Sequence, residues 1–306
     1  MRPLRIGTRG SRLALWQAHW IRDRILDQFP SLPLELEIIK TKGDQIQDRP
    51  LSAIGGKGLF IKELEVALMA HRTDMAIHSM KDVPAELPQG LEIATITLRE
   101  NPHDGLIAPH VARLEDLPPH AIIGTSSLRR AAQLKAYRPD FQIKSLRGNV
   151  DTRLKKVMAG EVDAAIMAVA GMKRLGLEAH ITQVLPFSIM LPAIAQGVIG
   201  IETRVGDRET LSYLQHLKDP DTTDCIRAER EVLRVLEGNC QISIAGFCDI
   251  HQDQLTLTAL IAKPDGSLIH RHQDSAPRPQ AEPLGQTVAR NILDQGGRDI
   301  LRDFQE

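Results

Sequence analysis

Residues 75–84 read MAIHSMKDVP, a stretch that places polar side chains at the end of an apolar strand. The run 75–78 is short and apolar, as expected of a strand inside a sheet, and the segment after it turns toward a proline. Lys81 and Asp82 therefore fall at the carboxyl end of the strand, the edge where open α/β sheets bind ligands. Taken alone, Asp82 also fits a turn residue or a helix cap.

The chain before this stretch alternates between strands and helices. A strand at 5–8 leads into a helix at about 12–29, and Ser11 is in the position of the N-cap of that helix. A second strand at 34–41 alternates apolar residues with glutamate, and an apolar helical pattern follows at 60–68. This alternation predicts an α/β fold.

The glycine-rich segment 54–58, which contains Lys57, lies between that second strand and the helix after it. It resembles a nucleotide-binding P-loop only superficially. Leu51 stands where such a loop has its first glycine, and Gly58 replaces the serine or threonine that holds magnesium. We therefore do not expect binding of ATP or GTP.

A second lobe is predicted after the polar, proline-containing segment 99–102, which fits a hinge. Its strands are expected at 105–108, 121–124, 142–146 and 163–168. The strand at 198–202 is expected to return to the first lobe, so that the chain crosses between the lobes twice and forms a hinged cleft. The predicted domains are a first lobe at 1–98 plus 198–216, a second lobe at 103–192, and a third domain at 220–306.

Six arginines lie near predicted strand-to-helix turns and so gather at one edge of the two sheets: Arg9, Arg129, Arg130, Arg147, Arg153 and Arg174. A single arginine is usually a surface residue, but together they predict a cleft lined with guanidinium groups. Ser127 opens the helix that carries two of them, and the hydroxyls and free amides of a helix start bind anions. Guanidinium groups bind carboxylates through paired hydrogen bonds, so we expect a ligand with several carboxylates, and phosphate would fit nearly as well.

A helical pattern at 229–236 ends before Gly238, where a left-handed cap is expected, and Cys240 follows on a loop. A thiol in this position suits covalent attachment of a group, whereas a buried small hydrophobic residue is the ordinary alternative. The rest of this α+β domain is predicted to contain strands at about 243–247, 255–261 and 267–272, and a helix at about 281–294 that Gly296 and Gly297 stop.

The composition shows no strong charge bias. Among 306 residues, 38 are Lys or Arg and 39 are Asp or Glu, so the net charge is −1, and neither nucleic acid nor an anionic membrane is expected as a partner. No apolar run fits a signal peptide or a membrane span, and we expect a cytoplasmic protein. Three cysteines without a Cys-x-x-Cys pair predict reduced thiols and no metal site.

Several segments, in this order, give the chain a resemblance to the porphobilinogen deaminase (hydroxymethylbilane synthase) family of tetrapyrrole biosynthesis: GTRGS at 7–11, GGKGLF at 55–60, HSMKDVP at 78–84, GTSSLRR at 124–130, LRGNV at 146–150, and the stretch 229–240. The resemblance implies two lobes like type II periplasmic binding proteins and a small C-terminal α+β domain. It also implies condensation of four porphobilinogen molecules with loss of ammonia, followed by hydrolysis to hydroxymethylbilane. The product would pass to uroporphyrinogen-III synthase.

The resemblance further implies roles for individual residues. Cys240 matches the cysteine that carries a dipyrromethane cofactor as a thioether, and Asp82 matches the catalytic aspartate. Asp82 would stabilise the cation left by ammonia or protonate the leaving amine, and the sequence does not separate these roles. The cofactor would also contact Lys81, Ser127, Arg129, Arg130, Arg147 and Gly148, and the substrate or growing chain would contact Arg9, Ser11, Lys57, Arg153, Arg174 and Gln196.

Two positions beside Cys240 depart from the usual family pattern, which has a small residue before the cysteine and a proline three residues after it. This chain has Asn239 and Ser243 there. Asparagine tolerates left-handed backbone and the lost proline mainly loosens the loop, so we expect attachment to survive. Two alternatives remain: a non-catalytic, two-lobed receptor for an anionic ligand, and a relative without cofactor. We expect a monomer.

Overall fold

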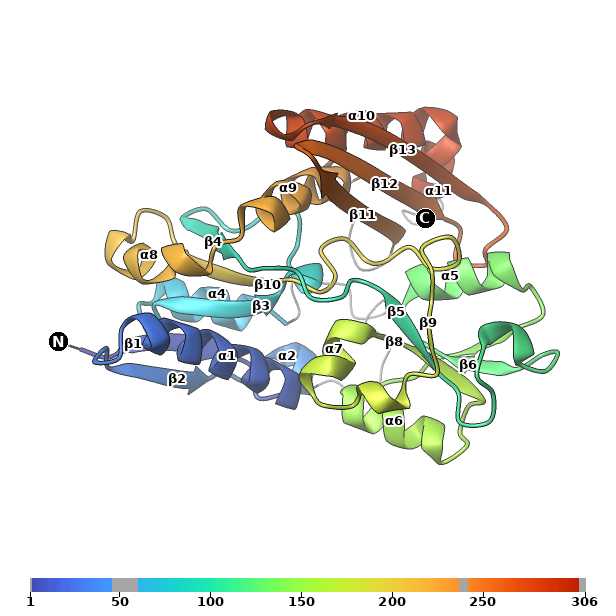
Figure 1. The fold of residues 1–306 in the computed structure, drawn as a ribbon, viewed down its shortest axis with the longest axis horizontal. Coiled ribbons are helices and arrows are strands. Elements are labelled where there is room, and N and C mark those ends of the chain that lie inside the picture. Colours follow the sequence, from blue (N-terminus) through green and yellow to red (C-terminus); the bar gives the residue numbers. More distant parts are fainter. Residues whose placement is uncertain (1, 46–59, 237–241, 303–306) are drawn as a thin grey trace. The chain divides into compact units, whose positions relative to one another are not determined.

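The computed structural model describes residues 2–45, 60–236 and 242–302. They form two compact units (Figure 1). The first unit consists of Met1–Glu100 with Val198–Thr223, and the second of Asn101–Gly197 with Asp224–Glu306. The chain therefore leaves the first unit and later returns to it. The finer division into three domains stays a prediction.

The first unit is built on a mixed five-stranded sheet. Its strands are β1 (Leu4–Thr8), β2 (Leu34–Ile38), β3 (Met75–Ser79), β4 (Leu91–Ile96) and β10 (Ile199–Arg204), in the order β2-β1-β3-β10-β4. Strands β2, β1 and β3 are parallel, whereas β10 is antiparallel to both of its neighbours, β3 and β4. The predicted return of the chain to the first sheet is confirmed. The carboxyl ends of β1 and β3 meet at one edge, so the segments that follow them lie close together.

Helices cover both faces of this sheet (Figure 1). They are α1 (Arg12–Gln28), α2 (Lys42–Gln45), α4 (Lys62–Met69) and α8 (Arg208–Leu214). Successive residues of a strand point to opposite faces, and β3 shows this directly. Ile77 packs in one buried cluster with Ile21 and Ile25 of α1, while its neighbour Ala76 packs in another with Leu64 of α4. The two clusters hold the sheet between α1 and α4.

The second unit repeats this arrangement. Its sheet contains β5 (Asp104–Ile107), β6 (Ile122–Gly124), β7 (Gln142–Lys144), β8 (Ala164–Ala168) and β9 (Gln183–Val184), in the order β7-β6-β8-β5-β9, with β5 antiparallel to its neighbours. Helices α5 (Leu128–Tyr137), α6 (Val150–Met158) and α7 (Val169–Arg174) follow β6, β7 and β8. On β8, Ile166 packs with Leu134 of α5, and Met167 packs with Leu154 of α6. Opposite faces are again covered by different helices.

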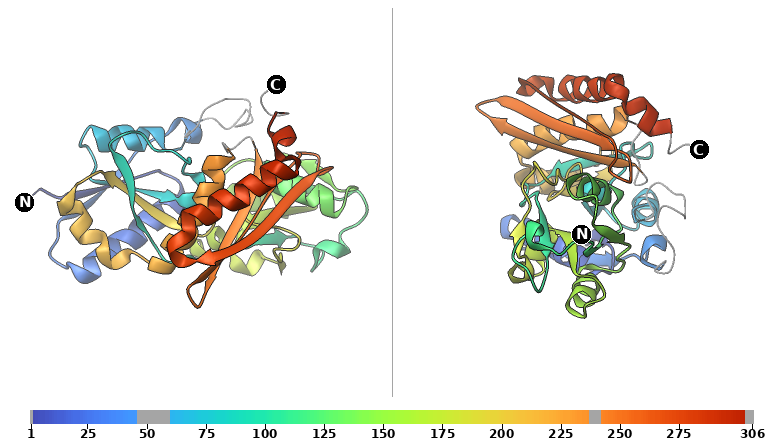
Figure 2. Two further views of the ribbon diagram at one scale, coloured as in Figure 1. Left: turned by 90° about the horizontal axis from the view of Figure 1, so that it is seen from above. Right: turned by 90° about the vertical axis from the view of Figure 1, so that its right-hand side faces the viewer.

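The C-terminal part of the chain contains an antiparallel sheet. The strands of this sheet are β11 (Ser243–His251), β12 (Gln254–Ala262) and β13 (Ile269–Pro277). The helices of this part of the chain are α9 (Pro220–Val235), α10 (Ala281–Ile292) and α11 (Arg298–Arg302). Helix α10 runs along one face of the sheet (Figure 2) and buries Leu284, Val288 and Ile292, which recur every four residues. Two α/β lobes with mixed sheets and a small α+β domain confirm the predicted fold class.

The predicted last helix, at about 281–294, corresponds to α10, which ends at Ile292, and the turn Leu293–Gly297 then leads into α11. Gly296 has a φ of +113°, a conformation that breaks the regular helix, as expected of a glycine at a helix end. The short helix α11 after the two glycines was not predicted. Among the described residues, no helix is both long enough and apolar enough to cross a bilayer.

Candidate active site

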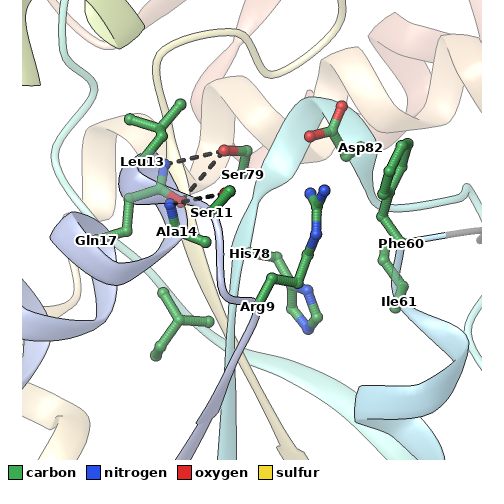
Figure 3. Close-up of a pocket in the computed structure, with 11 residues that line it drawn as sticks. Arg9, Ser11, Leu13, Ala14, Gln17, Phe60, Ile61, His78, Ser79 and Asp82 are labelled. Atoms are coloured by element: carbon green, nitrogen blue, oxygen red, sulfur yellow. Dashed lines mark hydrogen bonds between the residues drawn. The ribbon is translucent and has the colours of Figure 1, made fainter. Parts of the chain in front are cut away.

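A pocket opens in the first unit, at the carboxyl ends of β1 and β3 (Figure 3). It is lined by Arg9, Ser11, Leu13, Ala14, Gln17, Phe60, Ile61, Ile77, His78, Ser79 and Asp82. The polar side chains of the pocket come from two chain segments, 9–17 and 77–82, and Phe60 and Ile61 add apolar wall from a third. This pocket is the candidate active site.

Arg9 and Ser11 are placed by the connection from β1 to α1. Ser11 is the N-cap of α1, as predicted, and its hydroxyl accepts a hydrogen bond from the Ala14 amide at 3.3 Å. The Arg9 guanidinium lies over the Phe60 ring, with 4.1 Å between its central carbon and the ring centroid. Figure 3 shows the guanidinium pointing toward the same part of the pocket as Asp82. The pocket therefore holds a fixed cation beside a carboxylate.

Asp82 is placed by a single helical turn, Met80–Asp82, at the end of β3. Met80 is buried, and its amide donates to the Val198 carbonyl at 3.0 Å. A side chain at Gly200 of the neighbouring strand would collide with the Met80 sulfur, so the glycine makes room for it. Met80 thus fixes the turn, while Lys81 and Asp82 stay exposed to solvent.

Beneath the pocket lies a buried pair that the sequence analysis did not identify. His78 Nε2 lies 2.8 Å from Glu202 Oε2, and the two side chains are 3% and 0% exposed. Glu202 faces Ala76 across the antiparallel ladder, so it is the diagonal neighbour of His78 on the same face of the sheet. The available signal was the position of His78 in a predicted strand, but its partner depends on a strand register that the sequence does not reveal.

Arg129 and Arg130 sit in the first turn of α5, as predicted, but their guanidinium groups are buried in the second unit. Arg129 binds Asp104 Oδ2 at 2.8 Å, and Arg130 binds Asp104 Oδ1 at 2.7 Å. Each also donates to a backbone carbonyl, of Leu191 and Ile166 respectively. Burial lowers the pKa of Arg129, Asp104 opposes this effect, and Arg130 adds to it. The contacts that these two arginines make are therefore internal ones, while their predicted role toward the cofactor is untested.

The hydroxyl of Ser127 caps α5 by accepting the Arg130 amide at 3.4 Å. Further along, Gly148 has a φ of +112°, and a Cβ there would lie 2.7 Å from the Thr152 side chain, so glycine is required. Arg153 Nε donates to the Gly148 carbonyl at 2.8 Å. Arg147 is half-buried, and its Nε is fully buried without a hydrogen-bond partner among the described residues.

Arg174 and Gln196 both make hydrogen bonds within the second unit, near the point where the chain leaves it. Arg174 donates to the Gly197 carbonyl at 2.7 Å. Gln196 is buried, and its amide nitrogen donates to the Pro102 carbonyl at 2.7 Å and to Asp104 Oδ1 at 3.1 Å. The structure thus gives Arg174 and Gln196 contacts that hold the connecting segment, and their predicted contacts with substrate stay predictions.

Lys57 and Cys240, together with Gly238 and Asn239, lie outside the described residues. The other two cysteines, Cys225 and Cys248, are buried. Within the described part of the chain, no cluster of His, Cys, Asp and Glu side chains could hold a metal ion.

Comparison with known proteins gives matches to two family models. A model described as "Porphobilinogen deaminase, dipyromethane cofactor binding domain" matches residues 4–212, and one described as "Porphobilinogen deaminase, C-terminal domain" matches residues 223–294.

Several solved structures are also similar. YhfZ from Shigella flexneri is 18% identical, with 78% of this chain and 99% of that chain covered and a TM-score of 0.39. A nutrient binding protein from Burkholderia cenocepacia bound to methionine is 14% identical, with 72% and 93% covered and a TM-score of 0.42. A periplasmic substrate-binding protein of an ABC transporter from Coxiella burnetii is 13% identical, with 72% and 94% covered and a TM-score of 0.45.

Proposed function

The chain belongs to the porphobilinogen deaminase family, and from this premise we propose which of its residues carry the reaction. The enzyme is a hydroxymethylbilane synthase of porphyrin biosynthesis with a dipyrromethane cofactor domain. It joins four porphobilinogen molecules with release of ammonia and hydrolyses the product to hydroxymethylbilane. The observation that carries the assignment is that the two family models cover residues 4–212 and 223–294.

We assign the charge-stabilising role to Asp82. When the aminomethyl C–N bond of porphobilinogen breaks, the carbon and its pyrrole ring are left with a positive charge. A carboxylate held at the pocket stabilises this charge as it develops, and such electrostatic stabilisation is usually the largest single contribution to catalysis. The support is positional, because the Met80–Asp82 turn fixes Asp82 in the wall of the pocket. One carboxylate serves every condensation.

Arg9 and Ser11 are assigned to the carboxylates of the substrate or growing chain. Porphobilinogen carries an acetate and a propionate, and a guanidinium binds a carboxylate bidentately. Stacking on Phe60 orders the Arg9 guanidinium before substrate arrives, so less conformational entropy is lost on binding. The Ser11 hydroxyl adds a short polar contact at the same wall.

We propose that Cys240 holds the cofactor as a thioether, because a thiolate is a good nucleophile toward the same methylene carbon. The bound cofactor supplies the first pyrroles, to which substrate units are added. Its carboxylates need hydrogen-bond donors, and Arg147 fits this need, since its buried Nε has no partner among the described residues. Arg129 and Arg130 fit it less directly, because Asp104 already binds both.

The remaining assignments follow the family resemblance and stay part of the proposal. They comprise cofactor contacts by Lys81, Ser127, Arg129, Arg130 and Gly148, and substrate or chain contacts by Lys57, Arg153, Arg174 and Gln196. We also propose a cytoplasmic monomer that passes its product to uroporphyrinogen-III synthase. A reducing compartment suits a nucleophilic thiol, which must stay unoxidised until the cofactor is attached.

Intact-mass spectrometry of the purified protein tests the attachment site. The native protein should be heavier than its sequence by two linked pyrrole units, and Cys240→Ala should have the mass of its sequence alone. Cys225→Ala and Cys248→Ala are the matched controls and should keep the adduct. An adduct that persists in Cys240→Ala refutes the assignment. Ammonia release from porphobilinogen separates the enzyme from a receptor that only binds an anion.

A further inference from the structure

The pocket holds a second titratable group besides Asp82, the imidazole of His78. Its Nε2 lies within hydrogen-bond distance of Glu202, at 2.8 Å. Its other ring nitrogen, Nδ1, makes no hydrogen bond among the described residues and is therefore the atom that could exchange a proton with the pocket. Glu202 on β10 is completely buried, and its other oxygen, Oε1, has no partner among the described residues. A fully buried carboxylate is expensive to maintain unless hydrogen bonds or opposite charges compensate it, so its contact with His78 calls for an explanation.

The surroundings of this pair are acidic. Glu65 of α4 is also buried, and its pKa is raised, first by burial and then by the negative charge of Glu202, while His78 and Lys62 oppose the shift. The other charged groups near the imidazole are Arg9 after β1 and Asp82 after β3, which line the same pocket. A carboxylate that accepts from the ring nitrogen of histidine fixes the tautomer and orientation of the ring.

We propose that His78 is the proton carrier of this pocket and that Glu202 is its positioning residue. The inference rests on the proposed function, since it concerns how protons move during the same condensation. Histidine exchanges protons near neutral pH, whereas an exposed carboxylate such as Asp82 suits the stabilisation of a cation. In this scheme Asp82 stabilises the cation formed on loss of ammonia, and His78 transfers the proton to and from the reacting groups.

The step balances in protons and electrons. The aminomethyl C–N bond breaks, its electron pair leaves with the nitrogen, and the nitrogen takes the proton of the His78 imidazolium and departs as ammonia. The carbon becomes cationic and accepts an electron pair from the acceptor pyrrole, which forms the new C–C bond. That pyrrole then loses the hydrogen of its reacting carbon as a proton, and the neutral imidazole takes it. His78 is thereby restored after every addition.

Two variants test the proposal, each beside a control. His78→Gln should lower single-turnover ammonia release by at least about 100-fold, the usual contribution of a general acid–base group. Glu202→Gln keeps the shape of the side chain but loses the carboxylate that orients the ring, and it should also lower ammonia release. Glu35→Gln, an exposed glutamate on β2 of the same sheet, should leave the rate unchanged.

A second measurement does not depend on turnover. The ¹⁵N resonances of the His78 ring, assigned by their loss in His78→Gln, should show hydrogen on Nε2 in the neutral ring, and this preference should weaken in Glu202→Gln. The intact mass of each variant reports whether the cofactor is attached, so a failure of the family function is distinguished from a failure of this inference. Ammonia release within about threefold of wild type in His78→Gln, or an unchanged rate and ring tautomer in Glu202→Gln, overturns the proposal. If His78→Gln does not fold, Glu202→Gln alone decides.

Discussion

Replacing Asp104 by asparagine should sharply lower the unfolding temperature of the second unit. Asp104 is completely buried, and its two oxygens receive hydrogen bonds from Arg129, Arg130 and Gln196. Asparagine has nearly the same shape, but it carries no charge and offers only one acceptor oxygen. Two buried guanidinium groups would then face each other without a counter-ion.

The expected loss follows from this arrangement. Removing one partner of a buried ion pair costs about 3–5 kcal/mol, because the remaining charge stays buried. A loss of 1 kcal/mol lowers the melting temperature by about 2–4 °C for a unit of this size, so the expected drop is roughly 6–20 °C. Asp294→Asn is the matched control, since Asp294 and its partner Arg298 are 70% and 61% exposed. That exposed pair should contribute about 0.5 kcal/mol or less.

Scanning calorimetry provides the measurement, and the unfolding transitions are followed separately because a chain with two units need not unfold in one step. The comparison is repeated in the Cys240→Ala background, which should lack the cofactor. An equal loss in both backgrounds means that Arg129 and Arg130 chiefly hold the second unit together. A loss confined to the cofactor-free background means that the arginines also bind the cofactor. A drop no larger than that of Asp294→Asn refutes the reasoning about the buried charges.

Two further predictions concern packing and acid stability. Gly285→Ala should destabilise the protein by about 1–3 kcal/mol in urea unfolding although alanine favours helices, because the new Cβ would collide with the Ala228 carbonyl oxygen and lie 2.6 Å from Glu231 Cβ. A neutral or stabilising effect would contradict this. The hydrogen bond from Arg138 lowers the pKa of Asp140 to about 2, so the stability it contributes is present above about pH 4 and is lost as the pH falls toward 2. Asp140→Asn should flatten the melting temperature between pH 4 and pH 2, and an unchanged slope would show that other carboxylates dominate.

Features that depend on neighbouring residues could be predicted from the sequence. Ser11 and Ser127 both cap helices, because a hydroxyl at this position reaches an amide only three residues away. Likewise, Asp82 falls at the end of β3 because the apolar run and the following turn are adjacent in the chain. The family motifs are also short runs of consecutive residues, so the resemblance to the family can be recognised from the sequence alone.

Features that depend on strand register could not be predicted. Arg129 and Arg130 occupy a helix start, and together with the other arginines at strand-to-helix turns they predicted an external anionic ligand. The structure provides an internal one: Asp104 lies on β5, whose antiparallel pairing with β8 places it opposite Ala168. The contact between Asp104 and Arg129 depends on β8, which pairs both with β5 and with β6, the strand before α5. No residue spacing in the sequence indicates this pairing. The same limit applies to the contact of His78 with Glu202.

In each of the two sheets a buried acidic residue lies on the corresponding strand, but its basic partner differs. Their strand orders are equivalent, and the antiparallel strand carries Glu202 in the first sheet and Asp104 in the second. Glu202 binds a histidine, whereas Asp104 binds two arginines. Arginine keeps its proton under all ordinary conditions, so the second unit gains a permanent charge cluster that can fix geometry but cannot exchange protons. Of these two buried pairs, only the one in the first unit can therefore exchange a proton, and that unit also holds Asp82.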